Sequence, residues 1–544
     1  MVFLSRRRFV TGLVAGGVAA AMPARPSRAS GYSLEIGELP VNFTGHPRVA
    51  TVVNGSLPAP LLRFREGDEV ALSVVNRLKV PSAIHWHGLL VPAAMDGVPG
   101  LSFHGIEPGG SYDYRFTARQ SGTYWYHAHA GYQEQTGLYG PIIIDPREPE
   151  PFTHEREYVV MFSDWSDLSP EHIVGLLKKQ SDYFTREKTM FTERREWARM
   201  RMSPTDRADV SASTYTYLVN GKTPAGNWTG IYSPGERIRL RFINAGAMTY
   251  FDVRIPGLKM TVVAADGQYV EPVTVDEFRL AVAETLDVIV TPEAGQAYTV
   301  FAQSMDRSGY ARGTLATAPG MQAAVPSPDR PVLLTMDDMG HGGMAGMPGM
   351  ASMPGMDHGS MVQHPATEKG NPFVDMQTMD PKPRLGSPGI GLREWDLQAV
   401  RVGHMPGHKV LALADLKSSF PDPDGREPGR TIELHLTGHM DRYVWSFNGV
   451  KFADSVPLEF THGERLRIVL VNDTMMEHPI HLHGMWSDVE DEDGAFLVRK
   501  HTLSVPPGTK RSYRVTADAP GRWAYHCHLA FHMGLGMFRE VHVA

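Results

Sequence analysis

HCHLAFHMGLGM, at residues 526–537, contains the only cysteine of the 544-residue chain. Cys527 stands between two histidines, and His532 and Met537 follow it five and ten residues later. A thiolate, two imidazoles and a weak thioether form the ligand set of a mononuclear blue-copper site. Neighbouring side chains of an extended segment point to opposite faces, so His526 and His528 face away from a copper ion that Cys527 binds. They must serve a second site, which other parts of the chain complete.

The composition is that of a turn-rich globular protein. Hydrophobic residues make up 42% of the chain and charged residues 21%, with 54 Gly and 41 Pro. These values favour an all-β fold, and the length predicts about three or four domains. The net charge of −7 gives no reason to expect a nucleic-acid partner. A single cysteine cannot form an intrachain disulfide, so stability must come from the cores and the metals.

Residues 1–29 have the features of an export signal. Ser5-Arg6-Arg7-Arg8-Phe9 precedes an apolar stretch that ends near Met22, and small residues follow up to Ala29. The twin arginine resembles a Tat signal, which exports folded proteins, and predicts a periplasmic location. The apolar stretch is too short for a permanent membrane span. The alternative is an ordinary basic N-terminal segment.

Three segments of the chain share one spacing. Each has an Asn-Gly pair, then a glycine followed by an acid, then an alternating stretch that ends in asparagine nine residues after that glycine. Asn-Gly indicates a tight turn, and the alternation indicates a half-buried strand. Three copies in order predict three homologous β domains. The matched residues are Asn54, Gly67 and Asn76; Asn220, Gly235 and Asn244; and Asn448, Gly463 and Asn472.

The copies differ in their histidines. Nine and eleven residues after the last asparagine, the first copy has His85 and His87, the third has His481 and His483, and the second has Val253 and Ile255. A later histidine pair is likewise present in the first and third copies, at His127-Ala-His129 and His526-Cys-His528, and missing from the second. The second domain is therefore predicted to lack metal ligands, and the first and third to share a site.

The predicted boundaries follow from these repeats. The three β domains are expected at residues 30–150, 151–330 and 389–544, with a small helical insertion around 170–201 in the second. Residues 331–388 are expected to form a flexible Met-rich loop, because methionine recurs at every third residue from Met344 to Met356. Glycine and proline between these methionines exclude a stable helix. The alternative is a linker of biased composition.

The four His-x-His pairs predict a multinuclear cluster. Within a strand the two imidazoles of a pair lie on one face, roughly 7 Å apart, which suits two neighbouring metal ions better than one. Scattered core histidines would not recur at matched positions, and zinc would not need the adjacent Cys-His-Met set. The remaining candidate, His478, completes the mononuclear site with Cys527, His532 and Met537. The first domain has Ser82, Ala128 and Gln133 at the equivalent positions, so it lacks such a site.

These motifs resemble those of the multicopper oxidases, of the three-domain laccase-like kind, over nearly the whole chain after residue 29. The resemblance implies three cupredoxin-like Greek-key β-barrel or sandwich domains. It also implies four copper ions: a type 1 ion at the mononuclear site, one type 2 ion and a type 3 pair. Type 2 copper would be bound by His85 and His481, one type 3 ion by His87, His127 and His528, and the other by His129, His483 and His526.

The resemblance also implies a reaction. Four one-electron oxidations of a substrate at the type 1 site are coupled to reduction of dioxygen to two waters, with Cys527 carrying each electron to His526 or His528. Asp96 resembles a carboxylate that these enzymes use near the cluster; the alternative is an aspartate of a surface turn. Relatives that oxidise cuprous ion often have an acid directly after the second type 1 histidine, where this chain has Met533.

The substrate is expected to be Cu(I), because thioethers are soft ligands that prefer it. Candidate ligands for substrate or labile copper are Met353, Met356, His358 and Met361, with Met475 and Met476 beside His478; Met336, Asp337 and Asp338 are weaker candidates. Met476 matches a substrate-copper position of cuprous oxidases, although Thr474 replaces a companion acid. Overall the chain looks most similar to the CopA-type periplasmic copper-resistance oxidases, and a monomer is expected. The alternatives are a laccase that acts on phenols or aromatic amines, and a copper-sequestering protein.

Overall fold

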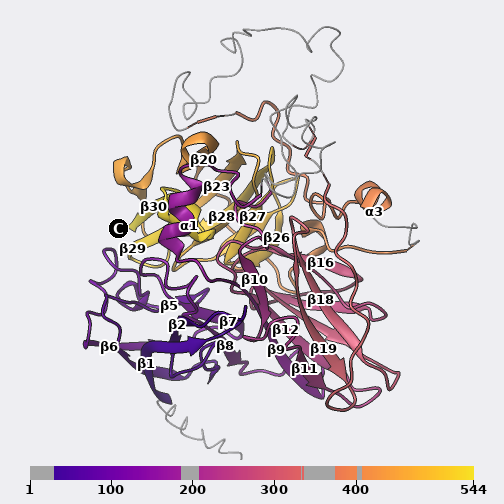
Figure 1. Cartoon of the computed structure of the whole chain (residues 1–544). Coiled ribbons are helices and arrows are strands. Elements are labelled where there is room, and N and C mark those ends of the chain that lie inside the picture. The colour runs from indigo at the N-terminus through magenta and orange to yellow at the C-terminus, as the bar shows by residue number, and fades with distance from the viewer. Residues whose placement is uncertain are drawn as a thin grey trace, which may run out of the picture.

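The computed structural model describes residues 30–185, 207–332, 334–335, 338, 374–375, 377–400 and 407–544. In these residues the chain forms three cupredoxin-like domains, each built from two packed β-sheets. The first domain (indigo) and the second (magenta) lie side by side, and the third (yellow) lies against both (Figure 1). The predicted all-β fold class is therefore confirmed. The predicted signal and most of the Met-rich loop lie outside the described residues.

The first domain has one sheet in the order β2-β1-β4-β6 and another in the order β3-β8-β7-β5. The strands are β1 (Ser30–Val41), β2 (Arg48–Val53), β3 (Leu62–Arg65), β4 (Glu69–Asn76), β5 (His85–His87), β6 (Ser111–Thr117), β7 (Gly122–His127) and β8 (Tyr139–Asp145), with a short 3-10 helix η1 (Ala93–Met95).

The second domain has the sheets β10-β9-β12-β17-β14-β15 and β11-β19-β18-β13-β16. Their strands are β9 (Arg156–Ser166), β10 (Tyr215–Val219), β11 (Trp228–Ile231), β12 (Ile238–Asn244), β13 (Phe251–Arg254), β14 (Met260–Ala265), β15 (Gln268–Val275), β16 (Glu277–Leu280), β17 (Thr285–Val290), β18 (Tyr298–Ser304) and β19 (Tyr310–Ala316). The predicted helical insertion contains helix α1 (Pro170–Leu177), which Ser169 caps by accepting a hydrogen bond from the backbone of His172.

The third domain has the sheets β21-β20-β23-β28-β25-β26 and β22-β30-β29-β24-β27. Its strands are β20 (Arg430–His439), β21 (Val444–Phe447), β22 (Leu458–Phe460), β23 (Arg465–Asn472), β24 (His478–Leu482), β25 (Ser487–Glu490), β26 (Phe496–Lys500), β27 (Thr502–Val505), β28 (Lys510–Thr516), β29 (Gly521–Cys527) and β30 (Phe538–Val543). The helical elements are α3 (Glu394–Val400), α4 (Ala530–Gly534), η5 (Leu413–Asp415), η6 (Met440–Arg442) and η7 (Phe452–Asp454).

The three domains repeat one strand pairing. In each, the first strand runs parallel to the strand that ends in the repeated asparagine: β1 with β4, β9 with β12, and β20 with β23. The strand after that asparagine then pairs antiparallel with a later strand: β5 with β7, β13 with β18, and β24 with β29. The repeated sequence spacing therefore corresponds to a strand pairing that all three domains share.

The Asn-Gly pairs form the turns that the sequence predicts. Asn54, Asn220 and Asn448 have φ of 51°, 47° and 53°, and the glycine after each also has a positive φ. Two successive residues with positive φ are the requirement of the tight hairpin turn that Asn-Gly favours.

The repeated asparagine at the end of β4, β12 and β23 has one role in all three domains. In the third domain, Asn472 Nδ2 donates to the carbonyls of Met476 and Val505, and its Oδ1 accepts from the backbone N–H of Thr474. Asn76 and Asn244 make the equivalent bonds in the other domains. This side chain therefore fixes the loop that leads into the histidine-bearing strand.

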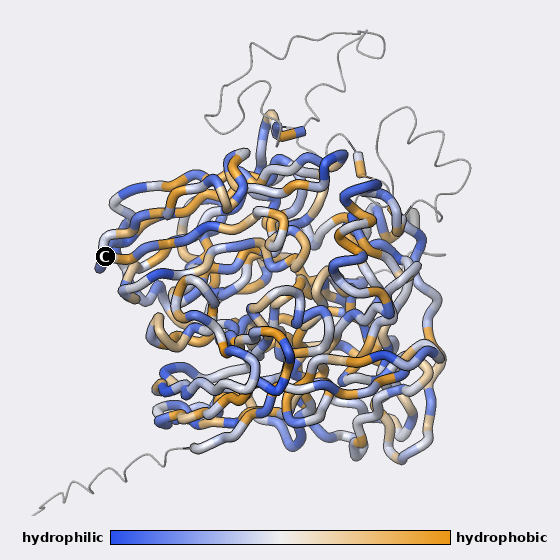
Figure 2. The backbone as a smooth tube through the Cα atoms, turned by 60° about the vertical axis from the view of Figure 1, so that its left-hand side comes forward, coloured by the Kyte–Doolittle hydropathy of each residue, from blue (hydrophilic) through white to orange (hydrophobic). Residues whose placement is uncertain are grey.

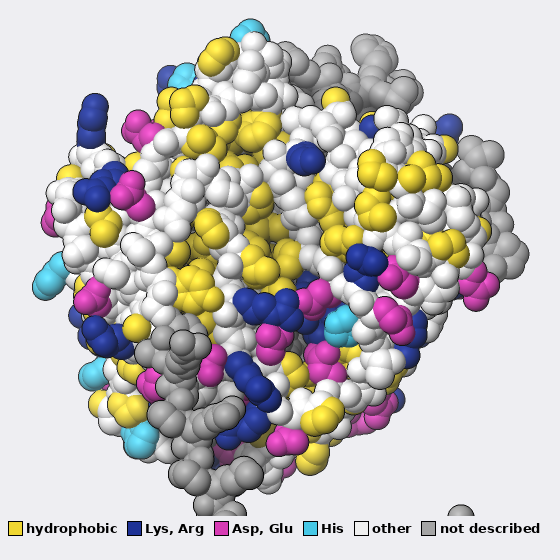
Figure 3. Space-filling view, turned by 90° about the horizontal axis from the view of Figure 1, so that it is seen from below, with side chains coloured by type: hydrophobic (Ala, Val, Ile, Leu, Met, Phe, Trp, Pro, Cys, Tyr) yellow, Lys and Arg dark blue, Asp and Glu magenta, His cyan; other side chains and the backbone are white. Residues whose placement is uncertain are grey.

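Burial follows the alternation of the strands. Along β4 every second residue is buried, and hydrophilic and hydrophobic segments alternate along the tube of Figure 2. Figure 3 shows one outer face, where hydrophobic side chains gather in a central hollow and charges of both signs lie together beside it.

The domain interfaces also bury charged groups. Lys500 of the third domain lies 3.0 Å from Asp266 and 3.1 Å from Glu284 of the second. Arg279 of the second domain lies 2.7 Å from Glu477 of the third. Buried ion pairs need well-defined geometry, so these contacts fix how the domains dock.

Candidate metal centres

Strand pairing brings the histidine motifs together within each domain. His85 of β5 lies opposite His127 of β7 in the first domain. In the third domain, His481 of β24 lies opposite His526 of β29, and Ile480 lies opposite Cys527. In the second domain, the equivalent β13–β18 pair places Val253 opposite Ala302. Homologous strands thus carry imidazoles in two domains and apolar side chains in the third.

The histidine pairs of the first and third domains face each other across the domain interface. His129 Nε2 of the first domain lies 3.3 Å from His526 Nε2 of the third, and that atom also lies 3.0 Å from His483 Nε2 of its own domain. His127 Nε2 and His528 Nε2 lie 3.3 Å apart. Ring nitrogens that converge in this way suit a shared cation. The groups whose ligand atoms all lie within 4.8 Å are His85, His87 and His481; His87, His127 and His528; and His129, His483 and His526.

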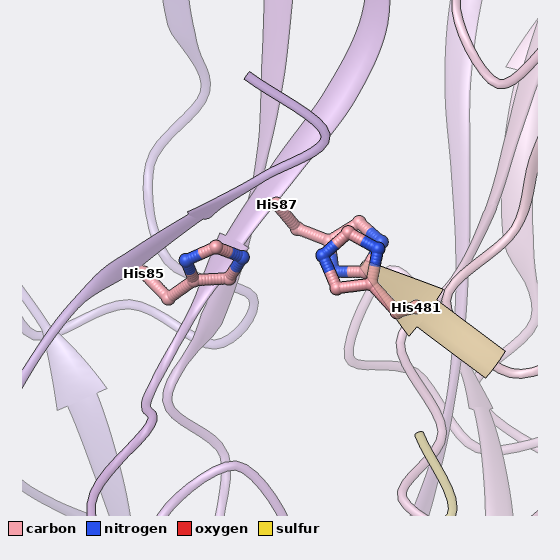
Figure 4. Close-up of side chains that lie close together, drawn as sticks. All are labelled: His85, His87 and His481. Atoms are coloured by element: carbon pink, nitrogen blue, oxygen red, sulfur yellow. The ribbon is translucent and has the colours of Figure 1, made fainter. Parts of the chain in front are cut away.

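Several buried ring nitrogens have no hydrogen-bond partner among the described residues. They include Nε2 of His85, Nε2 of His481 and Nδ1 of His87. In Figure 4 His87 and His481 stack on each other, with ring centroids 3.9 Å apart, and His85 lies beside them. Unpaired, buried lone pairs on adjacent imidazoles fit a metal ion, because leaving them without any partner would cost free energy.

The histidines are held in the neutral form that metal binding requires. Burial, followed by repulsion from neighbouring imidazoles, lowers the pKa of His87, His129 and His528 well below the ordinary value. Burial lowers the pKa of His526 to about 4. Neutral imidazoles leave a nitrogen lone pair available at neutral pH.

The predicted mononuclear site is also assembled. Cys527 Sγ lies 3.5 Å from His478 Nδ1 and 3.8 Å from His532 Nδ1, and all three side chains are buried. Met537 is buried as well, and its backbone accepts a hydrogen bond from Cys527 and donates one to His532. Burial raises the pKa of the Cys527 thiol, so a thiolate there requires a bound cation.

The two histidines of this site have partners that the sequence did not reveal. His478 Nε2 lies 2.7 Å from Thr474 Oγ1, and His532 Nε2 lies 2.7 Å from Asp209 Oδ2. Asp209 belongs to the second domain and also accepts a hydrogen bond from Tyr443. These contacts fix which ring nitrogen faces Cys527. No motif includes Asp209, so only the docking of the domains reveals its role.

Asp96 lies inside the cluster region and is 1% exposed. Its Oδ2 is 2.8 Å from His483 Nδ1, its Oδ1 is 3.3 Å from His85 Nδ1, and its backbone carbonyl is 2.8 Å from the same nitrogen. One carboxylate therefore contacts a first-domain and a third-domain histidine.

Three further buried residues contact the cluster histidines and were not predicted from the sequence. His501 Nδ1 lies 3.1 Å from His87 Nε2, and Thr502 Oγ1 lies 3.1 Å from the same atom. Glu134 Oε2 lies 2.7 Å from His127 Nδ1. Burial, together with the nearby Asp164, raises the pKa of Glu134. None of the three residues stands in a repeated pattern that could have identified it.

Only some of the candidate ligands for substrate copper lie within the described residues. Met353, Met356, His358, Met361, Met336 and Asp337 lie outside the described residues. Met476 is buried, and Met475 packs against Leu334 and Ile390. Asp338 is buried and forms an ion pair with Arg393, which favours a structural role.

A cleft of about 810 Å³ reaches the cluster from outside. It is lined by the segment from His129 to Gln133, by Trp165 and by the start of α1. His129 is partly exposed, whereas the other predicted cluster histidines are buried. The cleft therefore offers a path between solvent and the histidine cluster. No helix in the described part of the chain is long and apolar enough to cross a membrane.

Comparisons with known proteins agree with this geometry. Models of the multicopper oxidase family match residues 35–149, 156–320 and 425–544. The chain is 57% identical to copper resistance protein A of Escherichia coli over 99% of each chain. It is 31% identical to a multicopper oxidase of Mycobacterium tuberculosis, over 95% of this chain and 88% of that protein.

A solved structure shows the same fold. The multi-copper oxidase from Pseudomonas thermotolerans superposes with a TM-score of 0.62 and 21% sequence identity, over 95% of this chain and 99% of that one. The family models and the identity to copper resistance protein A confirm the family that the sequence motifs resemble. The chain therefore belongs to the multicopper oxidase family and is an oxidoreductase whose cofactor is copper.

Proposed function

We propose that this multicopper oxidase oxidises Cu(I) to the less membrane-permeant Cu(II), with dioxygen as the electron acceptor, and that it serves copper tolerance. His478, Cys527, His532 and Met537 would hold a type 1 ion. The eight histidines of the four His-x-His pairs would hold one type 2 ion and a type 3 pair, as assigned from the sequence motifs. When bound, these ions would accept electrons from the substrate one at a time and reduce dioxygen to water.

The protein's own residues prepare the site for this chemistry. Burial keeps the imidazoles neutral, Asp96 and the Thr474 hydroxyl orient ring nitrogens, and Cys527 joins the two sites through its neighbours His526 and His528. The short covalent path from Cys527 to either histidine suits electron transfer between the sites. The cleft beside His129 suits the entry of dioxygen and the exit of water.

One observation carries the choice of Cu(I) as substrate: both ends of the Met-rich segment lie beside the loop that leads into His478. At the upstream end, Leu334 packs against Met475. At the downstream end, Thr378 N–H donates to Asp473 Oδ1, and the Thr378 hydroxyl donates to the carbonyl of Asn472. The described ends of the Met-rich segment are therefore anchored next to the predicted type 1 site, and the thioethers that its sequence supplies are soft ligands that prefer Cu(I). The identity to a copper resistance protein supports the same function.

The cellular setting is part of the proposal. The twin-arginine signal supports export of the folded protein to the periplasm, with cleavage near Ala29. We propose that the protein acts there as a monomer and that the segment 339–373 also holds labile copper.

The test compares oxygen uptake by copper-loaded protein with stabilised Cu(I) and with a simple phenol. Two variants are needed: one that lacks residues 340–372, and one of unchanged length with Met344, Met347, Met350, Met353 and Met356 replaced by leucine. Leucine preserves size and apolarity but cannot bind copper.

We expect both variants to lose most of their Cu(I) turnover and to keep their phenol turnover. Equal Cu(I) turnover in the wild type and both variants would contradict the proposal. Fast phenol oxidation with no uptake from Cu(I) would instead identify a laccase, and no uptake with either donor would favour copper storage.

A further inference from the structure

The histidine cluster has a second buried carboxylate in addition to Asp96. Glu134 lies in the loop between β7 and β8 and is 6% exposed. Its Oε2 is 2.7 Å from His127 Nδ1, and its Oε1 is 3.9 Å from His528 Nδ1. These two histidines come from different domains, and their Nε2 atoms converge to 3.3 Å. Glu134 therefore approaches the outer nitrogens of two side chains whose inner nitrogens face one point.

Two of these atoms lack partners. Glu134 Oε1 and His528 Nδ1 are both buried, and neither has a hydrogen-bond partner among the described residues. A buried donor or acceptor without a partner costs about 1–3 kcal/mol. The two atoms face each other across 3.9 Å, and a hydrogen bond would form if they approached by about 1 Å.

The loop that carries Glu134 is fixed on both sides. The neighbouring Gln135 accepts a hydrogen bond from Tyr215 and donates one to the carbonyl of Asp164, both in the second domain. Gly137 N–H donates to the carbonyl of Glu134, and Thr136 bonds to Thr51. The side chain is therefore presented by a rigid segment, as a positioning group requires.

We infer that Glu134 is a positioning residue for one type 3 copper ion: its two oxygens accept hydrogen bonds from His127 Nδ1 and His528 Nδ1. This arrangement presents Nε2 of both histidines to the same ion. It also ties a first-domain ligand to a third-domain ligand through one side chain. The inference rests on the proposed type 3 assignment. A carboxylate behind a metal-bound histidine fixes the ring and its tautomer, and loss of such a partner typically weakens metal binding 10- to 100-fold.

The parallel with Asp96 supports this role. Asp96 contacts His85 and His483, whereas Glu134 contacts His127 and His528. Each acid joins one histidine of the first domain to one of the third. The two acids thus divide four of the eight cluster histidines between them without overlap.

The decisive variant is Glu134→Gln. An amide offers one acceptor oxygen and places an NH2 group against the second histidine, where two donors would oppose each other. Glu171→Gln is the matched control, because it makes the same chemical change on the exposed surface of α1. The readouts are copper ions bound per chain, the fraction of that copper visible by EPR, and the visible absorption of the thiolate–copper bond.

We expect Glu134→Gln to bind copper at the cluster 10- to 100-fold more weakly and to show a larger EPR-visible fraction, because the type 3 pair is incomplete. The thiolate–copper absorption should stay at its wild-type intensity. Unchanged copper content and EPR signal would overturn the inference. Loss of the thiolate–copper absorption together with the cluster would also overturn it, because Glu134 would then support the domain interface as a whole. These readouts do not involve turnover, so they are independent of whether Cu(I) is the substrate.

Discussion

The two histidines of the predicted type 1 site differ in the charge of their partners. His478 bonds to the neutral hydroxyl of Thr474, whereas His532 faces the carboxylate of Asp209 at 2.7 Å. A carboxylate makes the imidazole a stronger donor than a hydroxyl does. Trp445 stacks on His532 with ring centroids 3.7 Å apart, which keeps this ring in place. The potential of the type 1 copper is therefore expected to depend on Asp209.

Replacing Asp209 with asparagine should raise that potential by tens of millivolts. The variant keeps the shape but removes the negative charge that favours Cu(II), and 59 mV corresponds to about a tenfold change for a one-electron couple. A redox titration followed by visible absorption measures the shift. Tyr443→Phe is the control, because it removes the other partner of Asp209 and leaves the contact with His532. A potential that is unchanged in Asp209→Asn, or equally changed in both variants, would refute this account.

At the residue scale, the sequence could predict only what stands in a recognisable motif. The His-x-His pairs recur at fixed spacings, and the Cys527 set combines ligand types that identify a single copper site. Asp209, Glu134 and His501 contact these histidines but stand in no pattern. Asp209 is more than 300 residues from His532 in the chain. Such contacts depend on how the domains dock, which local patterns do not encode.

Among the elements, the turn after η1 decides where Asp96 lies. Gly97 has φ of +84°, and a Cβ atom at this position would lie 1.8 Å from the carbonyl oxygen of Ile84 and 3.2 Å from His85 Cα. The turn is therefore pressed against the strand that carries the first histidine pair. Only glycine permits this approach, and the backbone carbonyl of Asp96 then reaches His85 Nδ1.

Gly97→Ala should therefore lower both the copper content and the unfolding temperature. Gly100→Ala is a matched control, because Gly100 has the same φ of +84° and open space around it. The control should cost only about 1 kcal/mol, the strain of a positive φ. Both variants have the strain of a positive φ, but only Gly97→Ala has the steric clash with Ile84. Thermal unfolding and copper analysis of the two variants therefore distinguish the effect of the clash from that of the strain. Equal effects would show that the approach to Ile84 is unimportant.

The elements themselves were largely predictable from sequence. Asn-Gly turns, alternating strands and the asparagine that ends β4, β12 and β23 appear where the spacing placed them. The extent of the helical insertion was less well determined: α1 ends at Leu177, and residues 186–201 of the predicted insertion lie outside the described residues. Amphipathic spacing predicts that a helix forms, but the length of the helix also depends on the surface that it packs against, which the spacing does not reveal.

For the whole molecule, a network of buried charges joins the second domain to the third. Asp252 lies 2.8 Å from Arg279 and 2.5 Å from Arg307, and Arg279 reaches Glu477 beside His478. Burial alone would raise the pKa of Asp252, but the two arginines outweigh it and lower the pKa to about 2. A domain predicted to hold no copper thus supports the domain predicted to hold the type 1 site.

This network predicts how stability falls in acid. An unfolded aspartate has a pKa of about 3.9, so the contribution of Asp252 is complete above about pH 4 and disappears as the pH falls to about 2. It should amount to about 2 kcal/mol of the free energy of unfolding. The free energy of unfolding of Asp252→Asn, measured with denaturant, should fall less over this pH range than that of the wild type. Asp113→Asn, at an exposed carboxylate, is the control and should behave like the wild type.

The pairing of His127 with His528 and of His483 with Asp96 has a consequence for biogenesis. Half of the cluster comes from residues 85–129 and half from residues 481–528, so neither half is a complete binding site. The nascent chain can present the full site only after His528 has emerged and the first and third domains have met. Metal loading is thus a late event that reports on completed folding. A chain truncated before His526 would not retain copper at the cluster, because the binding site would be incomplete.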